Sequence, residues 1–428
     1  MKKKFIALTL SLLTTIGLLA GCGSKESTAV DTPAGKEKIT VWAWDPNFNI
    51  AIMNTAKELY EAENENVEIE VIEMAKTDVE QKLHTILASG TTEDLPEIVL
   101  IEDYNSQKYL QSYPGTFEDL TGKIPHDEFA QYKVEVMTLD NKVYGLPFDT
   151  GVAGLYYRND ILSEAGFKAE DLQNITWERF IEIGKVVKEK TGKALISIDP
   201  ADLGLLRLMI STSGLWYFDA EGNPSIANNP QLKEAMLLMK EMIDTGVSEL
   251  HSGWENYLEG FNSGRIATVA TGVWMTPSVA QEETQKGLWN IAPIPKLEES
   301  GINAANTGGS SWYVLSGSEA KDSAIEFLNK VYTQDDFYQT ILTENGAVGS
   351  YLSSMTGEAY QKEQEFFNGQ AIYADFSTWM AEIPAINVGM YTYEAEAIVI
   401  NAFNEVLNGG DIDAALKSAE EQVILQIQ

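Results

Sequence analysis

Asp149 is a carboxylate between two apolar stretches of the sequence, where it could bind or react with a ligand. Gly145 and Pro147 punctuate the backbone just before it, and residues 152–157 have the pattern of a short buried strand. A strand that passes through a proline-containing bend into a second strand is typical of a chain leaving one sheet for another. A polar residue at such a crossover lies between two lobes, where ligand clefts concentrate. The alternative is an ordinary loop in which Asp149 caps a turn.

Strand and helix patterns alternate in the first part of the chain and predict a sheet that would position further polar residues. The apolar runs predict strands at 39–44, 67–72 and 98–101, with helices between them at 49–63 and 77–88. This order gives a parallel sheet covered by helices, whose ligands lie outside the carboxyl ends of the strands. The candidate ligand-binding residues at the ends of the first and third strands are Trp44, Asp45, Asn47, Asp103 and Tyr104. The alternative is that the polar residues among them start a turn or cap a helix.

Two later loops also follow or precede predicted strands. The loop 271–274 ends in Trp274 and follows an apolar strand at 266–270, so it emerges at the carboxyl end of that strand. The glycine-rich turn 306–312 precedes another strand. It lacks the lysine of a phosphate loop and does not open a helix, which excludes a nucleotide-binding loop.

Charge and histidine content exclude several classes of ligand. The formal net charge is −34, and it becomes −37 without the three lysines of the leader described below. Such acidity argues against nucleic acid, which requires a basic face. His84, His126 and His251 are the only histidines, and none pairs with another at metal-ligand spacing, so no metal is expected.

The N-terminus has the features of an export signal. Three lysines precede a mostly apolar run at 5–19, which is too short for a comfortable membrane span. The run ends in L-A-G-C, which resembles the lipobox of bacterial lipoproteins. We therefore expect residues 1–22 to be a signal peptide with lipidation at Cys22, the only cysteine. Residues 23–38 then read as a flexible polar tether to the outer face of the cytoplasmic membrane.

Seven short motifs, each weak alone, occur in an order that resembles the family 1 extracellular solute-binding proteins. These are the maltodextrin-binding-protein-like carbohydrate receptors of bacterial ABC importers. The resemblance covers residues 39–428. The motifs are V-W-A-W-D, L-P-E-I-V-L-I-E-D-Y, Y-G-L-P-F-D-T with L-Y-Y-R-N-D-I-L, F-N-S-G-R-I-A-T-V-A-T-G-V-W, W-N-I-A-P-I-P, N-T-G-G-S-S-W and A-I-V-I-N-A-F-N-E-V-L-N-G.

The resemblance implies an α/β, two-lobed periplasmic-binding-protein fold of type II, each lobe a sheet flanked by helices. By that template lobe one comprises 39–147 plus 287–318, and lobe two comprises 148–286 plus 319–428. It also implies a lipid-anchored monomer that is not an enzyme and needs no cofactor. Its expected partners are a carbohydrate, namely a di- or oligosaccharide, and the permease subunits of the importer.

A sugar ligand fits the residue types at these loops. Tryptophan and tyrosine stack on the apolar face of a pyranose, and aspartate, asparagine and serine bind its hydroxyl rim. The resemblance places Trp274 at the family's stacking position, and Trp379 at a cleft loop where it could also be packing. The complete set of expected ligand-binding residues is Trp44, Asp45, Asn47, Asp103, Tyr104, Asp149, Trp216, Trp254, Trp274, Gly308, Gly309, Ser310, Tyr391 and Tyr393.

Two alternatives remain open from the sequence. A lipid-anchored glycoside hydrolase also uses stacked aromatics with two carboxylates, which Asp45, Asp103 and Asp149 could supply. The same receptor fold could also bind a non-sugar polyol or a glycerophosphate, although the loops are acidic and aromatic rather than basic.

Overall fold

The larger of the main sheets has five strands in the order β2-β1-β3-β12-β6. The computed structural model describes residues 35–91 and 94–427. The first three strands are parallel, as the alternating sequence pattern predicts, whereas β12 runs antiparallel to both β3 and β6. The bounds are β1 Glu37–Ala43, β2 Val67–Glu73, β3 Ile98–Glu102, β6 Gly145–Pro147 and β12 Ser310–Val314.

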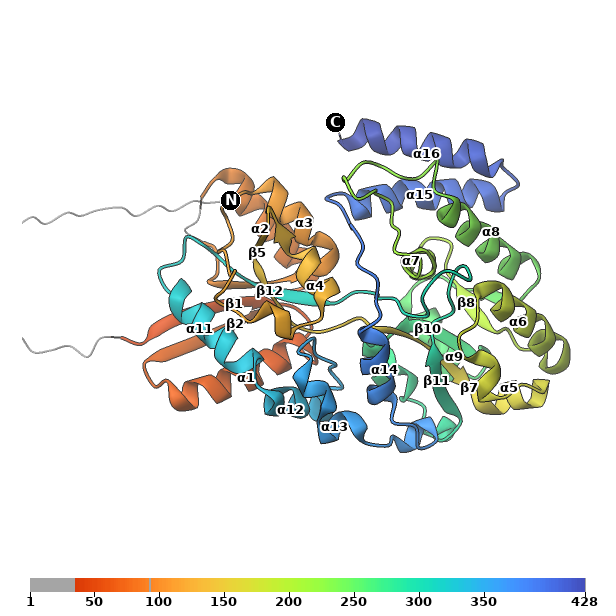
Figure 1. Cartoon of the computed structure of the whole chain (residues 1–428), viewed down its shortest axis with the longest axis horizontal. Coiled ribbons are helices and arrows are strands. Elements are labelled where there is room, and N and C mark those ends of the chain that lie inside the picture. The colour runs from red at the N-terminus through yellow and green to blue at the C-terminus, as the bar shows by residue number, and fades with distance from the viewer. Residues whose placement is uncertain (1–34, 92–93, 428) are drawn as a thin grey trace, which may run out of the picture. The chain divides into compact units, whose positions relative to one another are not determined.

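Helices cover both faces of this sheet (Figure 1). Ile39 and Val41 of β1 point to one face, where they pack with α1, α11 and α12. Trp42 follows Val41 in the sequence and points to the other face, where it packs with α2 and α3. The two-residue period of the strand therefore builds two cores, one on each side. The helices are α1 Asn49–Glu63, α2 Lys76–Ser89, α3 Asp103–Ser112, α11 Lys321–Tyr332 and α12 Asp335–Asn345.

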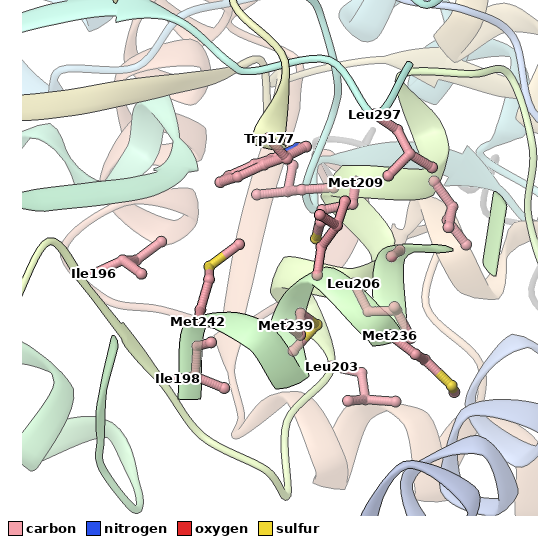
Figure 2. Packing of buried hydrophobic residues seen from close by; sticks show 14 of the residues in the cluster. Trp177, Ile196, Ile198, Leu203, Leu206, Met209, Met236, Met239, Met242 and Leu297 are labelled. Atoms are coloured by element: carbon pink, nitrogen blue, oxygen red, sulfur yellow. The ribbon is translucent and has the colours of Figure 1, made fainter. Parts of the chain in front are cut away.

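A second group of strands forms the other lobe. β7 lies at the centre of an antiparallel sheet in the order β10-β7-β11, and β8 pairs in parallel with β9. Its largest core includes Trp177 of α6 and a methionine stripe along α8, with Met236, Met239 and Met242 at helical spacing (Figure 2). The strands are β7 Ala153–Arg158, β8 Ile196–Ile198, β9 Ser248–Leu250, β10 Thr268–Gly272 and β11 Trp289–Pro293.

The remaining elements are mostly helices that surround the second sheet. Their bounds are α4 Gln131–Val136, β4 Thr138–Leu139, β5 Lys142–Val143, α5 Asn159–Ala165, α6 Trp177–Thr191, α7 Gly204–Ser211, α8 Pro230–Asp244, α9 Trp254–Asn262, α10 Thr276–Val279, α13 Glu358–Gln361, α14 Ile372–Met380, α15 Thr392–Leu407 and α16 Ile412–Ile427. Among the described residues, no helix combines the length and the apolar character needed to cross a membrane. Cys22 and most of the expected tether lie outside the described residues.

The lobe boundaries expected from the sequence differ from this arrangement in two places. The segment 287–318 was expected in lobe one, but its strand β11 pairs with β7 in the second sheet. The segment 319–428 was expected in lobe two, but its helices α11 and α12 pack on the core of the larger sheet. Both differences arise because the second and third passages of the chain between the lobes come later in the sequence than the motif order suggested, after β11 and after α12.

Three chain segments pass between the two lobes and lie side by side. Residues 148–152 connect β6 to β7, residues 294–309 connect β11 to β12, and residues 347–350 follow α12. The Thr307 amide donates to the Gly151 carbonyl (2.8 Å), and the Thr150 amide donates to the carbonyl of Val348 (3.0 Å). A Cβ at Gly151 would come within 2.0 Å of the Thr307 carbonyl oxygen, so this close approach requires glycine.

The ammonium group of Lys133, in α4, holds these segments together from within the protein. Its side chain is fully buried, and Nζ donates to the carbonyl oxygens of Asp149 (2.5 Å) and Ser310 (2.8 Å). The third partner is the Asp103 carboxylate, at 2.8 Å from Nζ. Burial raises the pKa of Asp103 to about 6, and the Lys133 charge opposes this rise. One cation thus binds three separate parts of the chain, through hydrogen bonds to two carbonyls and an ion pair with one carboxylate.

We expect Lys133→Met to lower the free energy of unfolding by about 3–5 kcal/mol, because the buried Asp103 carboxylate would lose its cation. Chemical denaturation measures this loss. The double variant Lys133→Met/Asp103→Asn should recover part of it, since the unpaired charge is then removed as well.

The control for this prediction is Lys185→Met, which removes an exposed ion pair with Glu241 (2.6 Å). That change should cost less than about 1 kcal/mol. Equal losses for the Lys133 and Lys185 variants would contradict the role given to the buried ammonium.

Candidate functional site

A large open cavity of about 1030 Å³ lies between the two lobes. Its wall combines the loop after β1, the crossing segments and two tryptophans of lobe two. Many of the residues expected to bind ligand meet here, although they come from distant parts of the sequence. They are Trp44, Asp45, Asn47, Asp149, Trp254, Trp274, Gly308, Gly309 and Ser310.

A second, more enclosed cavity of about 280 Å³ lies in lobe two and shares its tryptophan wall with the first. Trp254 and Trp274 line both cavities, and their rings are stacked with centroids 6.2 Å apart and planes 27° apart. The paired indoles therefore stand between the two spaces and offer ring surface to each.

Local backbone geometry fixes the two tryptophans in this position. Trp254 is the first residue of α9, follows Gly253 in the left-handed region (φ 76°), and is 52% exposed. Trp274 follows β10, and its Nε1 donates to the Thr307 carbonyl (2.9 Å). A Cβ at Gly272 would lie 2.3 Å from Nε1 of Trp274, so the indole occupies space that only glycine leaves open.

The acidic loops present hydrogen-bond acceptors to the large cavity. Asp45 adopts a left-handed backbone (φ 63°), and its Oδ1 accepts from the Asn47 amide (3.1 Å). Oδ1 of Asp149 accepts from both the amide and the hydroxyl of Ser310, each at 2.7 Å. The other carboxylate oxygen of Asp149 accepts no hydrogen bond from any described residue, so it can still bind a ligand hydroxyl.

Five of the expected residues do not line this cavity, and Asp103 is the clearest correction. Asp103 begins α3 and points inward to Lys133 and to the Ser311 hydroxyl (2.9 Å). Its neighbour Glu102, the last residue of β3, lines the cavity instead. The turn from strand to helix between these two residues directs one carboxylate outward and the other into the core.

The other four are aromatic residues that pack rather than face the cavity. The ring of Tyr104 lies 5.3 Å from that of Trp216, whose Nε1 donates to the Thr392 hydroxyl (3.0 Å). The Tyr393 hydroxyl donates to Glu102 (2.6 Å), and Tyr391 packs against the core of lobe two.

Trp379, for which packing was the alternative to a cleft position, also lines neither cavity. Its ring lies 5.3 Å from that of Phe376 in the same helix, and it lies close against Gly154 of β7.

Sequence reasoning missed the polar residues of the enclosed cavity. Asp199 follows β8, a strand of three residues that is too short for its pattern to be seen. Asp45 was predicted from the rule that ligands lie at the carboxyl ends of strands, and the same rule would have predicted Asp199 if β8 had been recognised. The missed residues are Asp199, Asp202, Arg207, His251 and Tyr257 in the enclosed cavity, and Lys76 and Glu102 in the large one.

Carboxylates outnumber cations on both walls. The large cavity has the carboxylates Asp45, Glu102, Asp149 and Glu344 against Lys76 and Lys362. Lys76 is moreover paired with Glu102, with Nζ 2.5 Å from Oε2. The enclosed cavity has two aspartates against one arginine.

His251 adds no positive charge at neutral pH. Burial holds its pKa below the ordinary value, against the opposing influence of Asp199 and Asp202. In the described ranges, no three histidine, cysteine, aspartate or glutamate side chains gather closely enough to hold a metal ion. The walls therefore suit a ligand that has an apolar face and a rim of neutral hydroxyl groups.

Comparisons with known proteins agree with this arrangement. A family model described as bacterial extracellular solute-binding protein matches residues 55–395. The lactose-binding protein of Rhizobium radiobacter is 50% identical over 399 residues, which cover 93% of this chain and 94% of that protein.

Solved structures share the fold at low sequence identity. One extracellular solute-binding protein of family 1 has a TM-score of 0.77 at 20% identity, over 90% of this chain and 98% of that one. The transporter-associated binding protein of B. animalis subsp. lactis Bl-04, solved with β-1,6-galactobiose, has a TM-score of 0.70 at 21% identity, over 91% and 97%. These likenesses confirm the expected two-lobed α/β fold. The chain belongs to the bacterial extracellular solute-binding proteins.

Proposed function

We propose that this protein captures a neutral di- or oligosaccharide between its lobes and delivers it to the permease of an ABC importer. The observation that carries the proposal is the stacked pair Trp254 and Trp274, which forms one wall of both cavities. Lactose is the first candidate ligand, because the relative that is 50% identical is a lactose-binding protein.

The two cavities suit a ligand of more than one sugar unit. An indole offers a flat apolar surface to the C–H face of a pyranose, and carboxylate oxygens accept from its hydroxyls. Because the tryptophan pair has cavity space on both sides, one unit can occupy the enclosed space while the next extends into the larger one.

The charge of the walls favours a neutral ligand over the glycerophosphate considered above. A phosphate would face the surplus of carboxylates on both walls, since Lys76 is already paired with Glu102. Like-charge contacts of this kind cost several kcal/mol.

The hydrolase alternative has less support from the carboxylates themselves. Asp103 is buried against Lys133, and one oxygen of Asp149 is held by Ser310. Asp45 alone of the three is exposed on a loop without these constraints.

The proposal also includes attachment to the outer face of the cytoplasmic membrane through Cys22. Its support is the lysine-rich start, the apolar run and L-A-G-C in the sequence. A monomer tethered in this way could reach the permease while both lobes stay free to move.

Titration calorimetry should detect binding of lactose and of lactitol, its neutral reduced form. Lactobionate, which carries a carboxylate in the same open-chain unit, should bind on the order of tenfold more weakly than lactitol or worse. Comparing these two open-chain ligands separates the effect of charge from that of ring opening.

Lactobionate that binds as tightly as lactitol would contradict the preference for a neutral ligand. Lactose should also remain intact after prolonged incubation with the protein. Release of glucose and galactose would favour the hydrolase instead.

We expect Trp274→Ala and Trp254→Ala each to weaken lactose binding by about 1–3 kcal/mol, taking the scale of base stacking on aromatic rings. The stability loss should be modest because both rings are partly exposed. Calorimetry and thermal melting of each variant measure the two effects separately.

Trp379→Ala is the matched control, because this tryptophan packs on Phe376 and lines neither cavity. It should leave lactose binding unchanged. If Trp274→Ala unfolds easily while its folded fraction binds lactose normally, Trp274 is a packing residue and not a sugar platform.

Mass spectrometry of the protein from native membranes should find Cys22 as the N-terminal residue, carrying a diacylglyceryl group. Cys22→Ser should release the protein into the medium or leave its signal peptide uncleaved, because the serine hydroxyl cannot form the thioether. A wild-type protein that retains residues 1–21, or has an unmodified Cys22, would rule out the lipid anchor.

A further inference from the structure

Arg207 is the one cation on the wall of the enclosed cavity, as far as the described residues show. It projects from α7, a helix of otherwise mostly apolar residues. Its guanidinium lies 5.7 Å from the ring centroid of Tyr104 and is largely buried, with a side chain that is 12% exposed. An arginine in such a place needs acceptors for its five N–H groups.

The acceptors that the protein supplies to Arg207 are fewer than its donors. Nη1 donates to the Glu396 carboxylate of α15. Nε is buried and has no hydrogen-bond partner among the described residues. Nη2 donates to no described residue either, but unlike Nε it is not sealed from solvent. The open edge of the guanidinium is therefore the part available to the cavity.

Glu396 and Tyr217 fix the orientation of this arginine without lining the cavity themselves. Oε2 of Glu396 accepts both from Arg207 and from the Tyr217 hydroxyl (3.1 Å). Glu396 is buried, and Tyr217 is completely buried. A carboxylate held on one side by a tyrosine leaves the planar guanidinium little freedom to rotate.

We propose that Arg207 is a specificity-determining residue, whose Nη2 donates to one hydroxyl oxygen of the sugar unit in the enclosed cavity. Glu396 and Tyr217 are positioning residues that act through it. This inference rests on the proposed sugar-binding function and deepens it. A sugar that lacks this hydroxyl would leave a charged donor without an acceptor. We therefore expect the protein to bind such a sugar much more weakly than the complete one.

The first test compares Arg207→Lys with the unmodified protein, using lactose as the probe. Lysine keeps a positive charge near Glu396 but lacks the second planar donor, so the ion pair and the ligand contact are separated. We expect lactose affinity to fall on the order of ten- to a hundredfold. Arg179→Lys, in an exposed pair with Glu182 away from both cavities, is the matched control and should bind like the unmodified protein.

The second test uses the monodeoxy derivatives of lactose, each lacking one hydroxyl. One derivative should bind the unmodified protein on the order of ten- to a hundredfold more weakly than lactose, but should bind Arg207→Lys no more weakly than lactose does. Tyr217→Phe should weaken lactose binding on the order of two- to fivefold and leave the affinity for that same derivative unchanged. A tyrosine with a merely structural role would not show this selectivity.

Two results would overturn the assignment of Arg207. One is lactose binding to Arg207→Lys with unchanged affinity. The other is that every monodeoxy derivative which binds the unmodified protein more weakly than lactose also binds Arg207→Lys more weakly than lactose, by the same factor. Lactose that fails to bind the unmodified protein contradicts the proposed function before any variant is compared, so the two failures are distinguishable.

Discussion

The buried ammonium of Lys133 is the interaction on which the region between the lobes depends. It joins the start of α3, the segment that leads to β7 and the first residue of β12. A lysine loses much of its hydration when it is buried, so it is tolerated only where all three donors find acceptors. Here the acceptors are two carbonyls and one carboxylate, and the residues that bear them therefore cannot move independently.

The cavity wall follows from this constraint. The Lys133 bond to the Asp149 carbonyl fixes the backbone whose side chain accepts from Ser310. Two residues before Ser310, the backbone approaches Trp274, since a Cβ at Gly308 would lie 3.6 Å from Nε1 of that indole. The polar crossing segments and the tryptophan pair thus share one support, although Lys133 and Asp103 do not line the large cavity themselves.

The sequence allowed the fold and nine residues of the wall of the large cavity to be predicted. The rule that ligands lie at the carboxyl ends of strands led to Trp44, Asp45 and Asn47, which do line the cavity, because β1 is a clear run of β-branched and aromatic residues and its loop is exposed. It could not decide between Glu102 and Asp103, because the choice depends on where the strand turns into a helix. The expectations for Tyr104, from its place after a strand, and for Trp216, from the family resemblance, also failed, since a large aromatic residue satisfies the pattern of a platform and that of a core equally well.

Lys133 and Arg207 were missed for two different reasons. Lys133 is one of several lysines on amphipathic stretches, and nothing in its neighbours indicates complete burial. Arg207 did leave a signal, because a lone cation in an apolar helix needs a buried partner or a ligand. The partner, Glu396, lies 189 positions away, and only the tertiary structure brings the two together.

The position of β12 has a consequence for how the chain can fold. This strand lies between β3 and β6, yet it is made from residues 310–314, after all three strands of the second sheet. The larger sheet therefore stays incomplete, with β3 and β6 unjoined, until more than 300 residues of the chain are present. Pairings between such distant residues form slowly, because the chain must first close a long loop. The sheet of the N-terminal lobe therefore cannot be completed before the strands of the second lobe have all been synthesised.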